Sequence, residues 1–545
     1  MRGQHLVCLG GVVEFDEAIK KEPHLRQYID RLKKETGRIP RFYERLTREL
    51  GDEPFVNIIY PAGEHVFVHI FIDKHIRRYE VIQPQLTQAE RTKYGRILNA
   101  ILENAPREEV PEDEKELEKT LLRLYEKSVK RTRLTFRDWG TKKVYVTDEE
   151  YVKFIYQLKR DIIGHALIQP LVDDWNLEDI HVVGTNEIGV VHKIFGPLIT
   201  NLKFDNLQYL GEYLRNLSER IGHPVSVARP IADSVLPDGS RINIIYADDI
   251  SIRGPSFTVR KFAAVPMSIM DLVKLGTIST EMAAYLWICL EYGMNIFFSG
   301  ETASGKTTFL NACLPMIRPD LKILSAEDTP EVRPPHKIWQ RLVTRTTGPE
   351  ESRVDMFSIL KAALRSRPNY IIVGEIRGVE GSVAFQAMQT GHSVLATFHA
   401  GSVRRLIQRL VGNPINIPIT FMDNLHVVAI LQAVYIKGRF QRRCISIEEI
   451  EGYSEEAGGV ITKQMFEWDG SRDEHRFLGL HNSYILEEKI APMAGYAEKR
   501  MVYIELEKRK RVLDAMYAKK IFDYDSVLKM FVRYYEEGID SLPTV

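Results

Sequence analysis

The sequence predicts an α/β protein in which a parallel sheet with crossover helices follows a smaller α+β region and a charged N-terminal region. Short apolar runs alternate with segments of helical length between residues 295 and 398, which indicates parallel strands joined by helices. These runs are apolar almost throughout, as in strands that are covered on both faces. A glycine-rich phosphate-loop pattern lies between the first run and the helix that follows it, as the mechanism of such a loop requires.

At 545 residues, the chain is much longer than a usual domain of ~150 residues. We expect a charged α+β domain that docks partners over residues 1–145, a second α+β domain over 146–262, and the parallel sheet over 263–545. The second domain is expected to open with a helix over Glu149–Gln169. It is expected to close on a hairpin about Leu236–Gly239, a strong turn signal between alternating segments.

The elements of the third region are predicted from the length and apolar pattern of each segment. The charged run Glu505–Arg511 within its helical tail is expected to be a solvated face. The predicted strands are Asn295–Ser299, Lys322–Ala326, Tyr370–Val373 and Ser393–Phe398, followed by a hairpin of Val427–Ile436 with Arg442–Ile450 and by tail helices at Met493–Lys520 and Tyr524–Glu537.

Composition excludes several classes of protein. Lys plus Arg and Asp plus Glu both number 74, so a protein that coats nucleic acid is not expected, and we expect no nucleic-acid partner. No apolar run approaches the ~18 residues of a membrane span, and no secretory signal is visible at the N-terminus. The cysteines Cys8, Cys289, Cys313 and Cys444 form no CxxC pair, which favours buried thiols in a reducing cytosol over zinc sites or disulfides.

The segment Gly300–Thr307 (GETASGKT) fits the phosphate-loop pattern at every specified position. Its glycines let successive backbone N–H groups face the phosphates, and the helix N-terminus adds the positive end of its dipole. Lys306 is expected to neutralise the β and γ phosphates, while the Thr307 hydroxyl binds Mg²⁺. We therefore expect ATP as substrate and Mg²⁺ as cofactor. The predicted nucleotide-binding residues are Gly300, Thr302, Ala303, Ser304, Gly305, Lys306, Thr307 and Thr308.

Acidic and histidine side chains follow later strands of the same sheet. The segments Glu327–Glu331 (EDTPE) and Gly374–Arg377 (GEIR) each come after an apolar run. Sites in open α/β sheets lie at the carboxyl ends of the strands, so both sets are candidates for the chemistry at the γ phosphate. His392 and His399 bracket the fourth strand from opposite ends and are not expected to share one metal ion. His399, at the carboxyl end, is the better candidate to contact nucleotide or to relay its state to a neighbour.

These motifs, in this order, resemble the secretion-motor ATPase superfamily, which drives type II secretion, type IV pili, conjugation channels and the archaellum. The resemblance extends from about residue 150 to the end. It implies a RecA-like P-loop core, a homo-hexameric ring, and MgATP hydrolysis that moves a membrane-embedded platform protein and other motor or filament components. It also implies a cytoplasmic protein that is peripheral at the inner face of the cell membrane through its partners.

The resemblance assigns roles to the two acidic sets. Glu331 would activate or orient the attacking water, and Glu375 would hold the magnesium shell, through water. An ordinary Walker B carboxylate is replaced by Gly374, with Glu375 next in line. That departure from most phosphate-loop enzymes is typical of this superfamily.

The region before the core also resembles the superfamily, in Leu177–Ile180 (LEDI) and Leu236–Arg241 (LPDGSR). Members use paired arginines of this region on the neighbouring subunit's nucleotide, where planar guanidinium groups suit γ-phosphate oxygens. The pair maps onto Arg241 and Arg260, with Arg253 as a competitor. The predicted catalytic residues are Glu331, Glu375, Arg241, Arg260 and His399, and the predicted metal-contacting residues are Thr307 and Glu375.

Within the superfamily, the archaeal branch is the most similar. Glu327–Pro335 (EDTPEVRPP), the long region before the phosphate loop and the helical tail resemble the archaellum motor ATPase and archaeal type IV pilus assembly ATPases. Filament rotation, pilus assembly and type II-like secretion all stay open.

Two other functions are compatible with the same core. A nucleic-acid translocase is one, because Arg333–Arg345 combines four basic residues with Trp339 and could line a channel. A scaffold that binds nucleotide without hydrolysing it is the other, although the carboxylates needed for hydrolysis are present.

Overall fold

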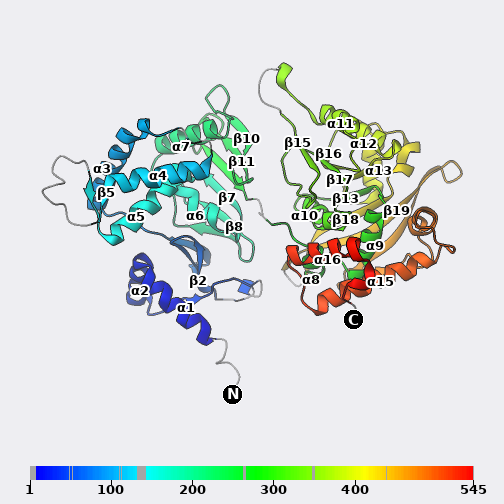
Figure 1. Cartoon of the computed structure of the whole chain (residues 1–545), viewed down its shortest axis with the longest axis horizontal. Helices are drawn as coiled ribbons and strands as arrows, with labels where there is room; N and C mark the ends of the chain where they lie inside the picture. The colour runs from blue at the N-terminus through cyan, green and yellow to red at the C-terminus, as the bar shows by residue number, and fades with distance from the viewer. Residues whose placement is uncertain are drawn as a thin grey trace. The chain divides into compact units, whose positions relative to one another are not determined.

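The computed structural model describes residues 8–47, 50–51, 53, 55–109, 111, 113–131, 143–261, 265–345, 350–436 and 439–543. The chain forms two compact units, residues 1–262 and residues 263–545, drawn from blue to green and from green to red in Figure 1. Among the described residues, no helix is both long enough and apolar enough to cross a membrane.

The first unit is built on one large, mostly antiparallel sheet. Its strands are β1 (Arg41–Phe42), β2 (Asn57–Gly63), β3 (Val66–Asp73), β4 (Ile76–Ile82), β7 (Leu177–Val183), β8 (Gly189–His192), β9 (Gly196–Thr200), β10 (Ile231–Val235), β11 (Arg241–Ile245) and β12 (Ser256–Arg260), while β5 (Val129–Lys130) and β6 (Val144–Tyr145) pair separately. The strand order is β1-β2-β3-β4-β9-β8-β7-β12-β11-β10. Residues 1–145 and 146–262, expected as two domains, thus share this sheet, because β4 pairs with β9 in parallel at Arg78 and Tyr79.

The helix expected in this unit is shorter in the structure. The helix expected over Glu149–Gln169 is wrong in length: α5 ends at Leu158, and a π-helical turn at Lys159–Ile163 and Gly164 separate it from α6. Pro23 begins α2, because its missing N–H is harmless in a first helical turn. The helices are α1 (Cys8–Lys21), α2 (Pro23–Thr36), α3 (Gln88–Asn104), α4 (Glu114–Ser128), α5 (Asp148–Leu158), α6 (Gln169–Asp173) and α7 (Leu207–Arg220).

The second unit has the expected α/β architecture. Its strands are β13 (Ile296–Gly300), β14 (Ile323–Glu327), β15 (Trp339–Val343), β16 (Tyr370–Ile376), β17 (Ser393–Phe398), β18 (Val427–Ile436), β19 (Arg439–Ser454), β20 (Gly459–Asp469) and β21 (Glu474–Phe477). They form one sheet in the order β15-β14-β16-β17-β13-β18-β19-β20-β21. All pairs from β15 to β18 are parallel, and the pairs from β18 to β21 are antiparallel. The predicted parallel sheet is confirmed.

Helices cover both faces of this sheet (Figure 1). Successive residues of β13 point to opposite faces, so Ile296 and Phe298 belong to one buried core and Phe297 to the other. The first core takes residues of α8 (Ile269–Lys274), α9 (Thr280–Glu291), α10 (Lys306–Cys313), α15 (Met501–Ala518) and α16 (Tyr524–Glu537); the second takes α11 (Met356–Arg365), α12 (Glu380–Gln389) and α13 (Val403–Val411).

The C-terminal helices are joined to the core by a buried ion pair. Arg509 of α15 is 1% exposed and donates to Glu291 of α9 at 2.5 Å and to Glu505 at 2.8 Å. Its guanidinium also lies over the Trp287 ring, with 4.7 Å to the centroid. The expectation that Glu505–Arg511 is a solvated face is therefore wrong for Arg509, because this side chain has buried partners on α9.

Candidate nucleotide-binding site

The phosphate loop joins the end of β13 to the start of α10 in a shape that requires glycine at two positions. A β-carbon on Gly300 would lie 2.2 Å from the Leu431 carbonyl oxygen of β18. Gly305 has φ +90°, a conformation that side chains disfavour, and caps α10. Between them, Ser304 donates from its hydroxyl to the Glu301 carbonyl at 2.8 Å. The loop is thus a preformed cradle whose helix begins at Lys306.

Lys306 is the positive group of this cradle. Its ammonium donates to the carbonyls of Gly300 at 3.1 Å and Glu301 at 3.0 Å. Burial lowers the pKa of Lys306, and the negative charges of Glu375 and Glu331 oppose that shift. Glu331, after β14, and Glu375, near the end of β16, therefore act electrostatically on the lysine of the phosphate loop, as expected for groups at one edge of a parallel sheet.

The acidic segment after β14 is organised by a carboxylate that no solvent reaches. Glu327 is fully buried and accepts from the backbone N–H of Glu331 at 2.5 Å and of Val332 at 2.6 Å. Burial raises its pKa, and the Arg341 guanidinium 3.4 Å away opposes the shift. Glu327 therefore holds the loop in place, while Glu331 keeps a half-buried side chain available.

The position of Gly374 explains why no carboxylate stands there. A β-carbon on Gly374 would lie 3.3 Å from Cγ of Glu327, so a side chain at 374 would crowd the buried Glu327 side chain. The register between β16 and β17 shifts between Val373 and Ile376, a bulge that re-aims the intervening residues. Glu375 lies in this bulge, half-buried, with the Arg377 guanidinium donating to it at 3.0 Å.

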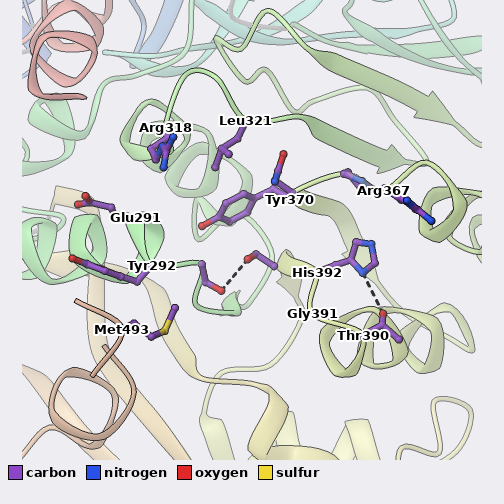
Figure 2. A pocket seen from close by; sticks show the side chains of 14 residues that line it. Glu291, Tyr292, Arg318, Leu321, Arg367, Tyr370, Thr390, Gly391, His392 and Met493 are labelled. Atoms are coloured by element: carbon purple, nitrogen blue, oxygen red, sulfur yellow. Dashed lines mark hydrogen bonds between the residues drawn. The ribbon is translucent and has the colours of Figure 1, made fainter. Parts of the chain in front are cut away.

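The two histidines lie at opposite ends of β17. His399 follows the strand at its carboxyl end, and its carbonyl accepts from Arg409. At the amino end, His392 contacts the Thr390 hydroxyl at 3.2 Å and lines a cavity of 490 Å³ together with Arg318 and Arg367 (Figure 2). That cavity lies at the starts of β16 and β17, away from the phosphate loop at the end of β13. In the part of the chain that the structure describes, no group of three or more His, Cys, Asp or Glu residues could hold a metal ion.

The candidate trans arginines belong to the first unit. Arg241 and Arg260 are register partners on β11 and β12. Arg260 donates to Asp179 of β7 at 3.2 Å, and Arg241 lies 3.7 Å from Asp233 of β10. Arg253 precedes β12, in the turn at the opposite end of the hairpin. The structure therefore brings Arg241 and Arg260 together and separates both from Arg253.

Two residues that touch the phosphate-loop region were missed by sequence reasoning. Arg442 of β19 donates to the Ala303 carbonyl at 2.9 Å, a contact that depends on the β18–β19 pairing and has no local signal. Asn311 of α10 bonds the segment that contains Glu331. Its position four residues after Thr307 places both on one face of α10, and this helical spacing is the signal that could have indicated it.

Two residues of the basic strip that suggested a nucleic-acid channel, Trp339 and Arg341, contact other residues of the sheet. Trp339 of β15 donates from its indole N–H to the Ser325 hydroxyl at 2.9 Å. Arg341 lies over the Trp339 ring, 5.2 Å from its centroid, and beside Glu327. The aromatic ring and this arginine thus already have partners in the protein, which weakens the translocase reading.

The residues around the loop fit a nucleoside triphosphate with Mg²⁺. A β-carbon at Gly300 would clash with the Leu431 carbonyl and the Ser304 hydroxyl, so the loop keeps its shape only with glycine there. Lys306 supplies the charge, and Thr307 places a hydroxyl in the first turn of α10. Mg²⁺ in such sites takes one or two protein ligands beside phosphate oxygens and water, which suits one hydroxyl and the nearby Glu375.

Comparisons with known proteins identify the family. The family model described as "Type II/IV secretion system protein" matches residues 166–429. The conjugal transfer protein TrbB of Rhizobium radiobacter is 31% identical over 232 residues, which cover 41% of this chain and 69% of that protein. The chain belongs to the type II/IV secretion system protein family. Secretion-motor ATPases of this kind use nucleotide, and the phosphate loop at 300–307 lies within the matched residues.

Other proteins differ widely in their similarity to the chain. An uncharacterized protein of Methanocaldococcus jannaschii is 54% identical over 548 residues, which cover 99% of this chain and all of that protein (100%). Among solved structures, the pilus retraction motor PilT with bound ADP is 17% identical, with a TM-score of 0.38 over 65% of this chain and 92% of that one.

Proposed function

We propose that this chain is an MgATP-hydrolysing motor that powers assembly or rotation of an archaeal type IV pilus-like filament, an archaellum or a pilus, or type II-like secretion. The observation that carries the proposal is the placement of two carboxylates, Glu331 after β14 and Glu375 near the end of β16, at the carboxyl edge of the sheet where the phosphate loop follows β13. A loop that only binds nucleotide needs no such carboxylates near the γ phosphate. The relative in Methanocaldococcus jannaschii supports an archaeal origin, because the similarity spans the whole chain.

Each residue of the site has a role in this reaction. The N-terminus of α10 and Lys306 bind the β and γ phosphates, whose charge they offset. Bound Mg²⁺ supplies further charge neutralisation, with the Thr307 hydroxyl and, through water, Glu375 as the groups that would hold it. Glu331 accepts a hydrogen bond from the attacking water and orients it toward the γ phosphorus. His399, at the end of β17, contacts the nucleotide or relays its state.

The motor acts as a homo-hexamer in which Arg241 and Arg260 reach the nucleotide of the neighbouring subunit. Two guanidinium groups that face each other across a strand pair favour a shared anionic ligand such as a γ phosphate. The ring works on a membrane-embedded platform protein and other motor or filament components, without nucleic acid. It is a cytoplasmic protein held at the inner face of the membrane by these partners.

Phosphate release from ATP by the purified chain, with binding of a fluorescent ATP analogue, tests the hydrolytic role. Glu331→Gln is expected to bind the analogue normally and to lower kcat at least about hundredfold, within the range of general base catalysis. Asp328→Asn is the matched control, because Asp328 is an exposed carboxylate of the same loop that bonds Thr344 at 3.0 Å. Undiminished turnover in Glu331→Gln would contradict the role of Glu331, and turnover that requires single-stranded DNA would favour a translocase.

A further inference from the structure

Asn311 is a buried amide on the helix that begins with the phosphate-loop lysine. It is 7% exposed, and both ends of its side-chain amide are engaged. The Nδ2 group donates to the Glu331 carbonyl at 3.0 Å, and Oδ1 accepts from the Arg333 backbone N–H at 2.8 Å. The Asn311 side chain thus bonds the backbone of the neighbouring segment at two places, the carbonyl of Glu331 and the N–H of Arg333.

The same short segment is held from its other side by the sheet. Glu327, the last residue of β14, accepts from the N–H groups of Glu331 and Val332. Glu327 connects the segment to the strand, whereas Asn311 connects it to the helix whose first residues are Lys306 and Thr307. The backbone that carries Glu331 is therefore fixed between two elements, and the distance from its carboxylate to the phosphate loop depends on both.

The chemistry of this bridge is specific to an amide. Asparagine offers a donor and an acceptor from one planar group, which matches a carbonyl and an N–H two residues apart. An ionised aspartate at 311 would keep the acceptor for Arg333 and lose the donor to Glu331. Leucine would have a similar size and neither group, and would leave the Glu331 carbonyl and the Arg333 N–H without this partner.

We propose that Asn311 is a positioning residue for hydrolysis, which holds Glu331 at the distance from the phosphates that the attacking water requires. The inference rests on the proposed function, because it assumes that Glu331 orients that water. A misplacement of about 1 Å in a catalytic group can cost roughly a hundredfold in rate. Asn311 itself acts only through the backbone of residues 331 and 333.

The first measurement compares kcat and KM for ATP in the wild type, Asn311→Leu and Asn311→Asp. We expect kcat to fall at least about tenfold in both variants, with KM and the affinity for a fluorescent ATP analogue within about twofold. The matched control is Asn295→Leu. Asn295 is 4% exposed and makes the same kind of bridge, donating to the Asn424 carbonyl and accepting from the Val394 N–H, both at 2.7 Å, at the amino end of β13. The Asn295→Leu variant is expected to lose stability but to keep the kcat of the wild type.

A double-mutant cycle with Glu331→Gln decides whether Asn311 acts through Glu331. Once Glu331 no longer orients the water, Asn311→Leu is expected to lower kcat by less than about twofold further, since residues that act together are not additive. A double variant whose loss in kcat equals the product of the two single losses would overturn the inference. So would Asn311→Leu and Asn311→Asp variants with the kcat of the wild type. If the leucine variant does not fold, the same cycle with Asn311→Asp carries the test. A wild type that binds the analogue but releases no phosphate would instead overturn the proposed function and this inference together.

Discussion

Arg241 of β11 and Arg260 of β12 lie directly opposite each other in the register of the first unit, with Asp179 and Asp233 beside them. Like charges at directly opposite positions destabilise a strand pair, and here the carboxylates of Asp179 and Asp233 offset part of that repulsion. The acidic neighbours hold the guanidinium groups at one end of the hairpin, both still exposed to solvent.

Loss of either arginine is expected to lower ATP turnover while each subunit still binds nucleotide. Arg241→Ala and Arg260→Ala are expected to lower kcat at least about hundredfold, because arginines that stabilise the transition state contribute ~10³–10⁵ in related phosphoryl transfers. Steady-state phosphate release measures this effect. Arg253→Ala is the control, since Arg253 lies at the other end of the hairpin. A large loss in Arg253→Ala with none in Arg260→Ala would reverse the assignment.

A mixing experiment tests whether these arginines act between subunits. Subunits with Arg260→Ala keep an intact phosphate loop, and subunits with Lys306→Ala keep intact arginines. Mixed rings are expected to recover part of the activity that neither variant has alone, because each supplies what its neighbour lacks. Activity that stays at the level of the separate variants would contradict an action in trans.

Gly374 is expected to tolerate no ordinary Walker B carboxylate. In Gly374→Asp, the new β-carbon would lie about 3.3 Å from Cγ of the buried Glu327. The two carboxylates would then compete for the same space. We expect the free energy of unfolding to fall by ~1–3 kcal/mol, as for other overpacked interiors, with loss of ATP turnover. Urea unfolding measures the first effect. Gly459→Ala is the control, since no atom lies within 4 Å of its added β-carbon, and equal stability of the two variants would show that the site at 374 has room.

The buried ion pair of Arg509 is expected to be important for stability. Arg509→Ala leaves Glu291, whose side chain is 19% exposed, without its 2.5 Å partner, and removing the buried member of such a pair is expected to cost up to ~3–5 kcal/mol. Arg511→Ala removes an exposed pair with Glu507 at 3.1 Å and is expected to cost less than ~1 kcal/mol. Denaturant unfolding of the two variants measures both values. Equal effects would mean that Arg509 contributes no more than a surface arginine.

Lys261 is expected to make the stability of the first unit depend on pH. Burial lowers its pKa to about 8, while its ammonium donates to the carbonyls of Leu171, at 3.3 Å, and Asp174. A lysine whose folded pKa lies below the unfolded value of 10.5 binds fewer protons in the folded state between these two values. Stability due to this group therefore rises with pH from about 8 to 10.5. The difference in unfolding free energy between wild type and Lys261→Met isolates this slope from titrating tyrosines, and a difference that stays constant with pH would contradict it.

The sequence indicated those features of the site that are contiguous in the chain. The phosphate loop, the parallel strands that precede it and follow it, and the acidic segments at strand ends all follow from local patterns between Asn295 and His399. The structure placed the corresponding strands within a few residues of the expected ones. Glu331 and Glu375 could be proposed because the carboxyl ends of parallel strands meet at one edge of a sheet.

Features that depend on pairing between distant segments could not be predicted. The pairing of Arg78 with Ile199 joins the strands of residues 1–145 to those of residues 146–262, and no local sequence pattern predicts it. Arg442 reaches Ala303 only because β19 pairs with β18. Charge alone suggested that Arg509 is solvated, whereas its partner Glu291 lies on a helix 218 residues earlier in the chain. In each case tertiary contacts decide the environment of the side chain.

The central claim is that Glu375 and the phosphate loop form a hydrolytic site in a ring of six identical subunits. The most direct measurement is phosphate release from MgATP by wild type and Glu375→Gln, with the mass of the same samples determined by light scattering. We expect only the wild type to release phosphate. In the presence of nucleotide, both proteins are expected to have a mass near that of six subunits. Equal turnover in Glu375→Gln, or a wild type that stays monomeric while it hydrolyses ATP at full rate, would contradict the account.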